Sequence, residues 1–223
     1  SGDGRYHRRA VAELPPEPTG DLVHHRTYDV RAYREADDTL RIRGIVQDEK
    51  PAGMYIEDDP EPLSIHQMVV DLVIAYPSLE IIDAQVVMEI TPHHGCTSIE
   101  PAYGQLVGIS IARGFTRKVR ELFGGPRGCT HVGALLQAMA PVAIQSMWSM
   151  VTVNEVPVEL SAADVAEKRR QAMLFNTNTC HVWDEHGEIV ARVNNGQEIE
   201  PPLWAVERLE KLGRTPEEWH SRA

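Results

Sequence analysis

Cysteine is scarce in this sequence, with three residues among 223. Three thiols cannot all pair with one another, and no two of them have the CxxC spacing of a redox motif or a zinc site. A fold held together by several disulfides, as in small secreted proteins, is therefore excluded, and a reducing cytoplasm is the expected location.

Aromatic residues make up 6% of the chain, so aliphatic side chains and Met must fill the core that a 42% apolar content allows. The net charge is −11, and the basic residues form no long stripe. Because neutralising phosphates requires such a stripe, we expect neither nucleic acid nor an anionic membrane surface as a partner. No uninterrupted apolar run approaches the length of about 20 residues that spans a bilayer. We also find no signal peptide.

The pattern along the chain predicts a flexible N-terminal arm over 1–21, a core domain over 22–195 and a C-terminal helical extension over 196–223. Within the core, apolar and polar residues alternate in four segments, which we predict to be strands. Short turns join the first to the second and the third to the fourth, and an acidic, Pro-rich loop over 51–63 joins the middle two. These segments are Val23–Glu35, Thr39–Gln47, Ser64–Ala75 and Leu79–Thr91.

Helical spacing of apolar residues follows the fourth strand. Thr130–Val151 is the strongest helix prediction, with Pro141 expected to kink or break it. We expect Cys180–Trp183 and Glu188–Val193 to pair as a hairpin. The fold class is thus α+β, an antiparallel meander sheet with helices packed on one face. The other predicted helices are Gln105–Ala112, Phe115–Leu122, Ser161–Met173, Leu203–Leu212 and Pro216–His220.

Several ionisable residues share the strand face of the apolar residues, because side chains alternate across a strand. They are His24 and Arg26 on the first strand, Asp48 and Lys50 on the second, and His66 on the third. Burying charge is costly unless it is paired or functional, so these residues predict a polar pocket at the rim of the sheet. The apolar sets are Tyr28, Val30 and Ala32; Leu40, Ile42 and Val46; Met68, Val70, Leu72 and Ile74; and Ile82, Ala84, Val86, Met88 and Ile90.

Each of these positions also has a purely structural interpretation. His66 at a strand end can be a rim histidine without a function, and Lys50 can simply reach solvent. Two cationic groups, His24 and Arg26, need either an acidic partner or an anionic ligand, and Asp48 can be that partner within the fold.

Every cysteine lies near a histidine, in the stretches His93–Cys96, Cys129–His131 and Cys180–His181. Cys and His are common zinc ligands, so convergence of these stretches would form a metal site. Because none has CxxC, HxxxH or HExxH spacing, we predict no metal and no other cofactor, with zinc as the alternative.

A Gly-rich turn, Gly124–Gly128, leads into the predicted helix. A helix N-terminus offers unpaired backbone N–H groups and the positive end of the helix dipole, where a carboxylate or phosphate can dock. Cys129 and Thr130 are therefore candidates for substrate binding. The alternative is a plain helix start with a small buried cysteine.

At these residues the chain resembles a bacterial family known only as domain of unknown function 2889, from Val23 to Val193. Its segment Leu63-Ser64-Ile65-His66 departs from the Gly-x-Pro-Ile-His of the family. The resemblance implies no reaction, but it picks out His24, Arg26, Asp48, His66 and His131. The shared motifs are His24-x-Arg26, Val30-x-x-Tyr33, Asp48-x-Lys50, Ile65-His66-x-Met68, Asp83-Ala84, Pro92-x-x-x-Cys96, Gly128-Cys129-Thr130-His131 and Cys180-His181.

From these residues we expect a small enzyme that applies histidine acid–base chemistry to an organic anion. His24, His66, Asp48 and His131 form the expected catalytic set, in which a histidine moves the proton and Asp48 orients or balances it. The expected substrate-binding residues are Arg26, Lys50, Tyr28, Cys129 and Thr130.

Because the chain has neither a Rossmann glycine fingerprint nor a P-loop, a cofactor-independent lyase or isomerase is favoured, most specifically a lyase of aromatic compound catabolism. One alternative is a hydrolase or acyl transferase with Cys129 as nucleophile and His131 as base, or a zinc-assisted hydrolase. Another is a ligand-binding or accessory protein without turnover. An open sheet edge makes a homo-oligomer, most simply a homodimer, the expected assembly.

Overall fold

A computed structural model describes residues 16, 18–154 and 162–222. The chain divides into two compact units, one ending at Met150 and one beginning at Val151. Each unit is described by itself below. The three-part division drawn from the sequence stays a prediction.

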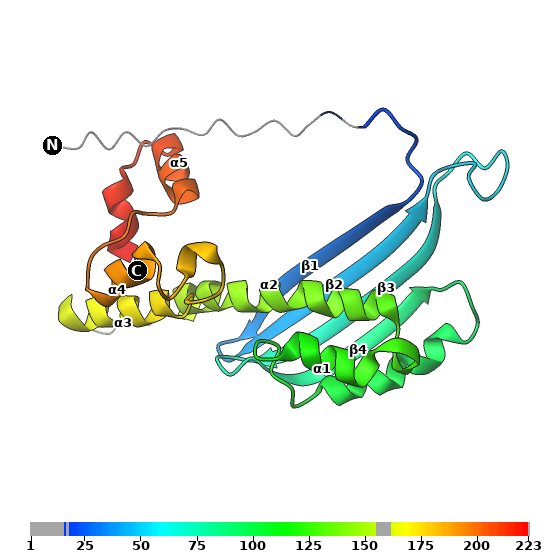
Figure 1. Cartoon of the computed structure of the whole chain (residues 1–223), viewed down its shortest axis with the longest axis horizontal. Helices are drawn as coiled ribbons and strands as arrows, with labels where there is room; N and C mark the ends of the chain where they lie inside the picture. Colours follow the sequence, from blue (N-terminus) through cyan, green and yellow to red (C-terminus); the bar gives the residue numbers. More distant parts are fainter. Residues whose placement is uncertain (1–15, 17, 155–161, 223) are drawn as a thin grey trace. The chain divides into compact units, whose positions relative to one another are not determined.

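The first unit is built on a four-stranded antiparallel sheet with the order β1-β2-β3-β4 (Figure 1). Each strand pairs with the next along the chain, so the predicted meander and the α+β class are confirmed. The acidic segment between β2 and β3 forms a loop that projects beyond the sheet (Figure 1). The strands are β1 His25–Ala36, β2 Thr39–Lys50, β3 Leu63–Ala75 and β4 Glu80–Ile90.

Helices cover one face of this sheet (Figure 1). The covered face buries the apolar positions of β2 and β3, and Leu135, Leu136 and Met139 of α2 pack against it. Gly44 permits this close approach, because a Cβ built there would lie 2.7 Å from the Met139 Sδ. The helical elements of this unit are η1 Cys96–Leu106, α1 Phe115–Phe123, η2 Gly125–Arg127 and the part of α2 Thr130–Asn154 up to Met150.

The strand prediction fails at Ile82, which was assigned to the apolar face of β4. The pairing of β3 with β4 shifts between Val73 and Ile74, so that Ile74 pairs with Ile81 and Val73 with Asp83. This irregularity turns Ile82 outward, where it is 48% exposed, while Ile81 is fully buried. A bulge of this kind leaves an extra residue in one strand and breaks the alternation on which the prediction depended.

Two further secondary-structure predictions are wrong. The helix expected over 105–112 is absent: η1 ends at Leu106, and Gly108 with a φ of 85° turns the chain so that 108–111 bond back to β4 and the residues before it. The expected hairpin around Gly187 is also absent from the described residues. There, η3 (His181–Trp183) precedes α4 (Glu188–Asn194), and Gly187 occupies the N-cap of α4, with Glu188 in its first turn favouring a helix start.

α2 continues through Pro141 as one element, so the predicted break is not found. Pro141 lies on the exposed side of the helix, where water can hydrate the carbonyl that loses its partner.

By length and composition alone, α2 is also apolar enough to cross a membrane. The stretch Thr130–Val153 has no Asp, Glu, Lys or Arg, a property that a search for uninterrupted apolar runs overlooks. In its most apolar window 28% of the residues are buried, and Leu135, Leu136 and Met139 of this helix pack on the sheet. Because core helices pass the same test, this is weak evidence for a membrane span.

The second unit is helical, as predicted for most of its segments. Val190 and Val193 of α4 are buried, as are Ala205, Val206 and Leu209 of α5. The indole rings of Trp204 and Trp219 meet edge to face. Ser161, where the predicted helix over 161–173 begins, lies outside the described residues. The elements are α3 Ala162–Leu174, η3, α4, α5 Leu203–Lys211 and η4 Pro216–Arg222.

Candidate functional site

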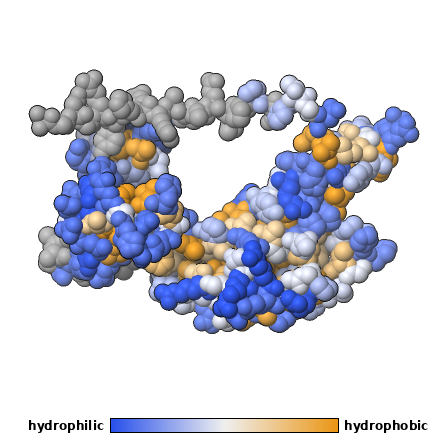
Figure 2. Space-filling view, viewed as in Figure 1, coloured by the Kyte–Doolittle hydropathy of each residue, from blue (hydrophilic) through white to orange (hydrophobic). Residues whose placement is uncertain are grey.

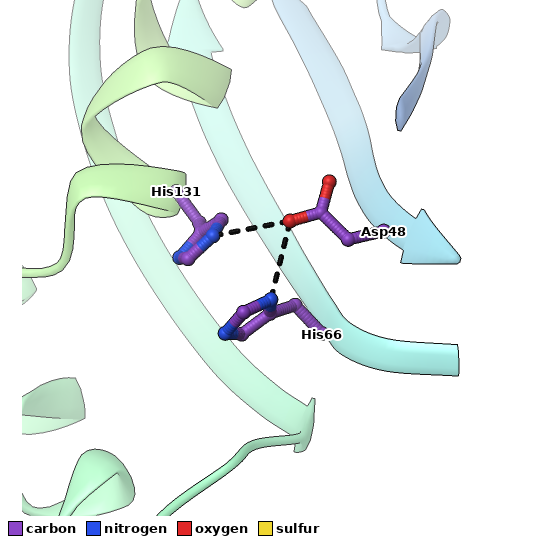
Figure 3. Close-up of side chains that lie close together, drawn as sticks. All are labelled: Asp48, His66 and His131. Atoms are coloured by element: carbon purple, nitrogen blue, oxygen red, sulfur yellow. Dashed lines mark hydrogen bonds and ion pairs between the residues drawn. The ribbon is translucent and has the colours of Figure 1, made fainter. Parts of the chain in front are cut away.

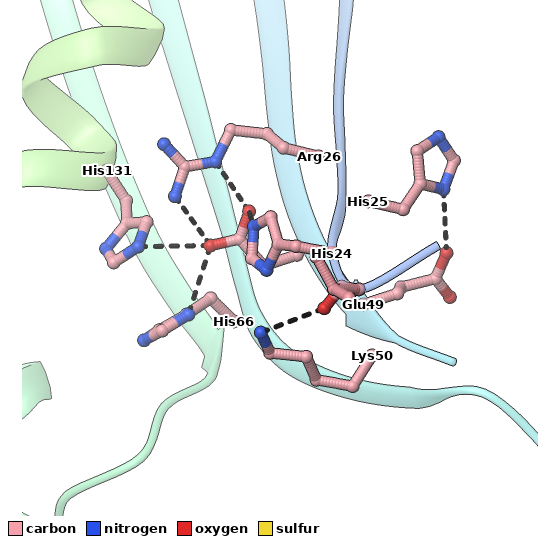
Figure 4. A network of polar contacts seen from close by, with 9 residues as sticks. His24, His25, Arg26, Glu49, Lys50, His66 and His131 are labelled. Atoms are coloured by element: carbon pink, nitrogen blue, oxygen red, sulfur yellow. Dashed lines mark hydrogen bonds and ion pairs between the residues drawn. The ribbon is translucent and has the colours of Figure 1, made fainter. Parts of the chain in front are cut away.

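A row of three polar residues crosses the covered face near one end of the sheet. Arg26 of β1 is directly opposite Asp48 of β2, and Asp48 is opposite His66 of β3. Residues opposite one another in antiparallel strands point to the same face, so the row follows from strand register. Figure 4 shows these side chains converging from neighbouring strands, with His131 reaching them from α2.

Asp48 is the centre of this cluster, and its side chain is 1% exposed. Arg26 grips it with two hydrogen bonds, from Nε to Oδ1 at 2.5 Å and from Nη2 to Oδ2 at 2.6 Å. This guanidinium holds the pKa of Asp48 well below its usual range, and the same bonds raise the pKa of Arg26. The carboxylate is therefore ionised throughout the physiological pH range.

Three histidines surround the same carboxylate. The Oδ2 atom lies 3.2 Å from the Nδ1 of His66 and 3.2 Å from the Nε2 of His131 (Figure 3). The Oδ1 atom lies 3.3 Å from the Nε2 of His24. The rings of His66 and His131 lie with their centroids 4.0 Å apart.

The contacts with Asp48 fix the tautomers of His66 and His131. An ionised carboxylate only accepts hydrogen bonds, so the ring nitrogen facing Asp48 carries the proton. In the neutral rings, the Nε2 of His66 and the Nδ1 of His131 are then the proton acceptors. Burial, together with the nearby His66 and Arg26, lowers the pKa of His131 and favours its neutral form.

Cys129 stands beside the second of these acceptors, with its Sγ 3.6 Å from the Nδ1 of His131. The Cys129 carbonyl accepts the N–H of Gly133, which places Cys129 at the start of α2. Its own N–H donates to the hydroxyl of Tyr103 at 2.8 Å. Tyr103 is fully buried, and burial raises its pKa to about 12, so it holds this bond as a neutral phenol.

The structure brings together six of the predicted site residues: His24, Arg26, Asp48, His66, Cys129 and His131. The other three occupy the periphery. The Lys50 Nζ donates to the Val23 carbonyl at 3.2 Å and lies 5.2 Å from the centre of the Tyr55 ring. Tyr28 is partly exposed on β1, where its hydroxyl helps to raise the pKa of Arg26, and Thr130 is exposed at the first position of α2.

Sequence reasoning missed Tyr103 and Tyr55. Tyr103 comes from a 3₁₀-helix that the sequence pattern did not indicate, and nothing in its spacing connects it to Cys129. Tyr55 belongs to the acidic loop over 51–63, in which the sequence pattern predicted no site residue.

Exposed apolar residues flank the polar cluster at this end of the sheet. Leu22 and Val23 precede β1, while Met54, Tyr55 and Ile56 belong to the loop after β2, and all five are at least 39% exposed. Figure 2 shows apolar surface, in orange, near the end of the sheet where β1 begins. His66 and His131 are 18% and 17% exposed, so solvent and small molecules reach them.

Two surface hollows lie away from this cluster. One, of about 760 Å³, is lined by Ala112, Phe115 and neighbouring residues up to Glu121. The other, of about 460 Å³, lies over the uncovered face of the sheet near Ile45 and Val69. Neither is lined by Asp48 or by the residues that bond it.

Asp48, His66 and His131 could also hold a metal ion, because one ligand atom of each lies within 4.8 Å of the others. The Arg26 guanidinium, however, bonds both carboxylate oxygens, and its positive charge opposes a cation at the same place. Among the described residues, Asp48, His66 and His131 form the possible metal site, and no cysteine belongs to it. The alternative of a zinc site built from Cys and His therefore gains no support.

The fold and this cluster define a small α+β domain with an Asp-centred histidine site. A family model described as protein of unknown function (DUF2889) matches residues 24–145, which is more than half of the chain. The chain therefore belongs to this family, and the matched segment contains every residue of the cluster. No curated protein and no solved structure matches the chain.

Proposed function

We propose that this protein is an enzyme that performs histidine acid–base chemistry on a small organic anion. One observation carries the proposal: two adjacent histidines share one buried, ionised carboxylate, and each keeps its opposite ring nitrogen as a proton acceptor. A carboxylate behind an imidazole fixes the tautomer and stabilises the imidazolium that forms when the ring takes a proton.

The charge of the cluster favours an anionic ligand. One carboxylate faces a guanidinium and three imidazoles, and the Lys50 ammonium lies nearby (Figure 4). Arg26 binds Asp48 through its Nε and Nη2, and the Tyr28 hydroxyl lies beside the same guanidinium. Protonation of any histidine adds a further positive charge, so a carboxylate or phenolate stabilises the site.

The exposed apolar residues at the same end of the sheet favour a ligand with an apolar body. Leu22 and Val23 on one side and the Met54–Ile56 segment on the other offer surface for a ring. The substrate class that combines both properties is an aromatic carboxylate or phenol.

The reaction that we propose is a cofactor-independent elimination or isomerisation, as in a lyase of aromatic catabolism. The Nε2 of His66 would take a proton from a substrate C–H or O–H bond, whose electron pair forms a new double bond, while Asp48 stabilises the imidazolium. The proton then goes to the leaving group in an elimination, or to another carbon in an isomerisation. His131 and His24 would complete the proton path, with Arg26 and Lys50 orienting the anion.

The test is turnover of a panel of aromatic carboxylates and phenols, followed by mass spectrometry, with His66→Gln as the variant. We expect the wild type to convert at least one compound and His66→Gln to lose about 10²- to 10⁴-fold in kcat. His25→Gln is the matched control, since His25 pairs with Glu49 rather than with Asp48. Tight binding without turnover, with His66→Gln changing affinity alone, would identify a binding protein instead.

A second candidate function follows from the contact between Cys129 and His131. Cys129 Sγ, the His131 ring and Asp48 form a continuous chain of the kind used by cysteine hydrolases and acyl transferases. His131 Nδ1 would take the thiol proton as sulfur bonds to the substrate acyl carbon. The leaving group would take that proton, and water would release the acid from the thioester.

Acyl-enzyme formation tests this candidate. Wild type incubated with an activated aryl ester should gain the mass of the acyl group at Cys129, and His131→Gln should slow this step. Cys129→Ser should lose hydrolysis while keeping its fold. Full turnover by Cys129→Ser would eliminate the candidate, whereas the mechanism centred on His66 would survive.

A further inference from the structure

β1 is an edge strand with one of its sides open. It pairs with β2 from His25 to Ala36, with an irregularity at Glu35, and no described residue pairs with its other side. Alternate residues of this twelve-residue strand point their backbone N–H and C=O groups to the open side, where they form a template for another strand. The opposite edge, β4, bonds instead to the segment around Ile109 and Ser110.

Strand geometry restricts how β1 can pair with β1 of a second copy. A two-fold axis perpendicular to the sheet relates the two β1 strands, so that they run antiparallel. Residues opposite one another must then point to the same face of the sheet. Only alternate registers satisfy this condition, because a one-residue slip would place an inward residue opposite an outward one.

We infer that β1 pairs with β1 of a second copy, centred on Val30. In this register Asp29 lies opposite Arg31 of the other copy, and Arg31 opposite its Asp29. His25 likewise lies opposite Glu35 of the other copy. The neighbouring allowed registers place Asp29 opposite Asp29 or Arg31 opposite Arg31, so the charges select the centre at Val30.

The covered face agrees with the same register. Tyr28 lies opposite Ala32 of the other copy, and Val30 opposite Val30. Tyr28 is 43% exposed in the single chain, so pairing would cover apolar surface that is now open. Arg26 and Arg34 would also meet, but each is already bonded to its own carboxylate, Asp48 and Asp37.

The occupant is a second copy rather than an unrelated peptide, because the strand is complementary to itself. Within one chain Arg31 donates to Asp29 through two bonds, at 3.0 and 2.6 Å. Arg31 also lies opposite Arg43 of β2, a like-charged neighbour on the outer face. A second Asp29 on its other side would balance that repulsion. This assembly does not depend on the proposed function.

Sedimentation equilibrium of the full chain tests the inference with two single charge reversals. We expect a wild-type dimer, and at least about tenfold weaker dimerisation for both Asp29→Arg and Arg31→Asp, since each creates like-charged opposite pairs. Mixing the two variants should restore dimers, because both positions are then arginine in one chain and aspartate in the other, so that each opposite pair joins unlike charges. Circular dichroism checks that each variant is folded.

Arg117→Asp is the matched control, because it makes the same charge change on the exposed surface of α1. It should dimerise like the wild type. A monomeric wild type, single variants that dimerise normally, or a mixture that stays monomeric would each overturn the inference. Dimers that survive in both folded variants would point to another surface.

Discussion

Two arginine–aspartate pairs of the same geometry lie on opposite faces of the sheet. Arg26 grips Asp48 from β1 to β2 on the covered face, and Arg43 grips Asp71 from β2 to β3 on the open face. Each pair joins neighbouring strands through Nε and Nη2 of the guanidinium. They differ in surroundings: Arg26 is 33% and Asp48 1% exposed, with three histidines beside the carboxylate, whereas Arg43 is 51% and Asp71 12% exposed.

The difference shows what burial adds to an ion pair. Water screens the pair on the open face, so it contributes little to stability. On the covered face the carboxylate has left water, and removing its partners leaves an uncompensated charge. The arginine–aspartate pair on the open face thus joins two strands at the surface, whereas the pair on the covered face is the centre of the candidate site.

The largest expected effect is the loss of stability when the charge of Asp48 is removed, compared with the same change at Asp71. Asp48→Asn should lower the free energy of unfolding by about 3 kcal/mol, because Arg26 and three histidines lose a shared buried partner. Asp71→Asn should cause a several-fold smaller loss. Urea denaturation of both variants measures this, and equal losses would show that burial does not distinguish the pairs.

The covered face should also reject added volume between the strands and α2. Gly44→Ala should cost about 1–3 kcal/mol, because the new methyl group would overlap Met139, with its Sδ at 2.7 Å from the Cβ position. Gly133→Ala is the matched control: nothing lies within 4 Å of its Cβ, and alanine favours the helix by up to about 1 kcal/mol. Thermal unfolding separates the two, and a neutral Gly44→Ala would contradict this packing.

Arg26 should keep metal ions away from Asp48, His66 and His131. Arg26→Gln removes the competing cation, and we expect zinc affinity to rise at least about tenfold by isothermal titration. Arg43→Gln, the same change on the open face, should leave zinc affinity unaltered. If wild type already binds stoichiometric zinc tightly, the guanidinium does not exclude the metal.

The smallest expected effect is a pH dependence of stability through His131. Its pKa is lowered in the folded protein from the ordinary value of 6.5, so between the folded pKa and 6.5 the unfolded chain binds more protons. Stability from this group therefore rises with pH through this window and is lost as pH falls. His131→Gln should flatten this slope, while His186→Gln, at a histidine 86% exposed, should not. Parallel slopes for wild type and His131→Gln would contradict the shift.

Much of the sheet and one row of the site could be predicted because strand alternation is a local property. Arg26, Asp48 and His66 share a face by parity, and the meander then places them side by side. The same reasoning failed at Ile82, because a bulge changes the parity and leaves no mark in the sequence. Strand alternation also could not decide whether Arg26 binds a substrate or Asp48, since that depends on the distance between the guanidinium and the carboxylate.

Local periodicity was sufficient to predict the four strands, the long helix from Thr130 and the polar residues on the covered face, because it acts over a few neighbouring residues. Tertiary structure alone decided that α2 lies where His131 reaches Asp48, and that Cys129 reaches His131 while Tyr103 holds its backbone. These contacts join residues far apart in the chain. Their geometry depends on how the helix packs over Gly44 and the neighbouring strands, which no local pattern encodes.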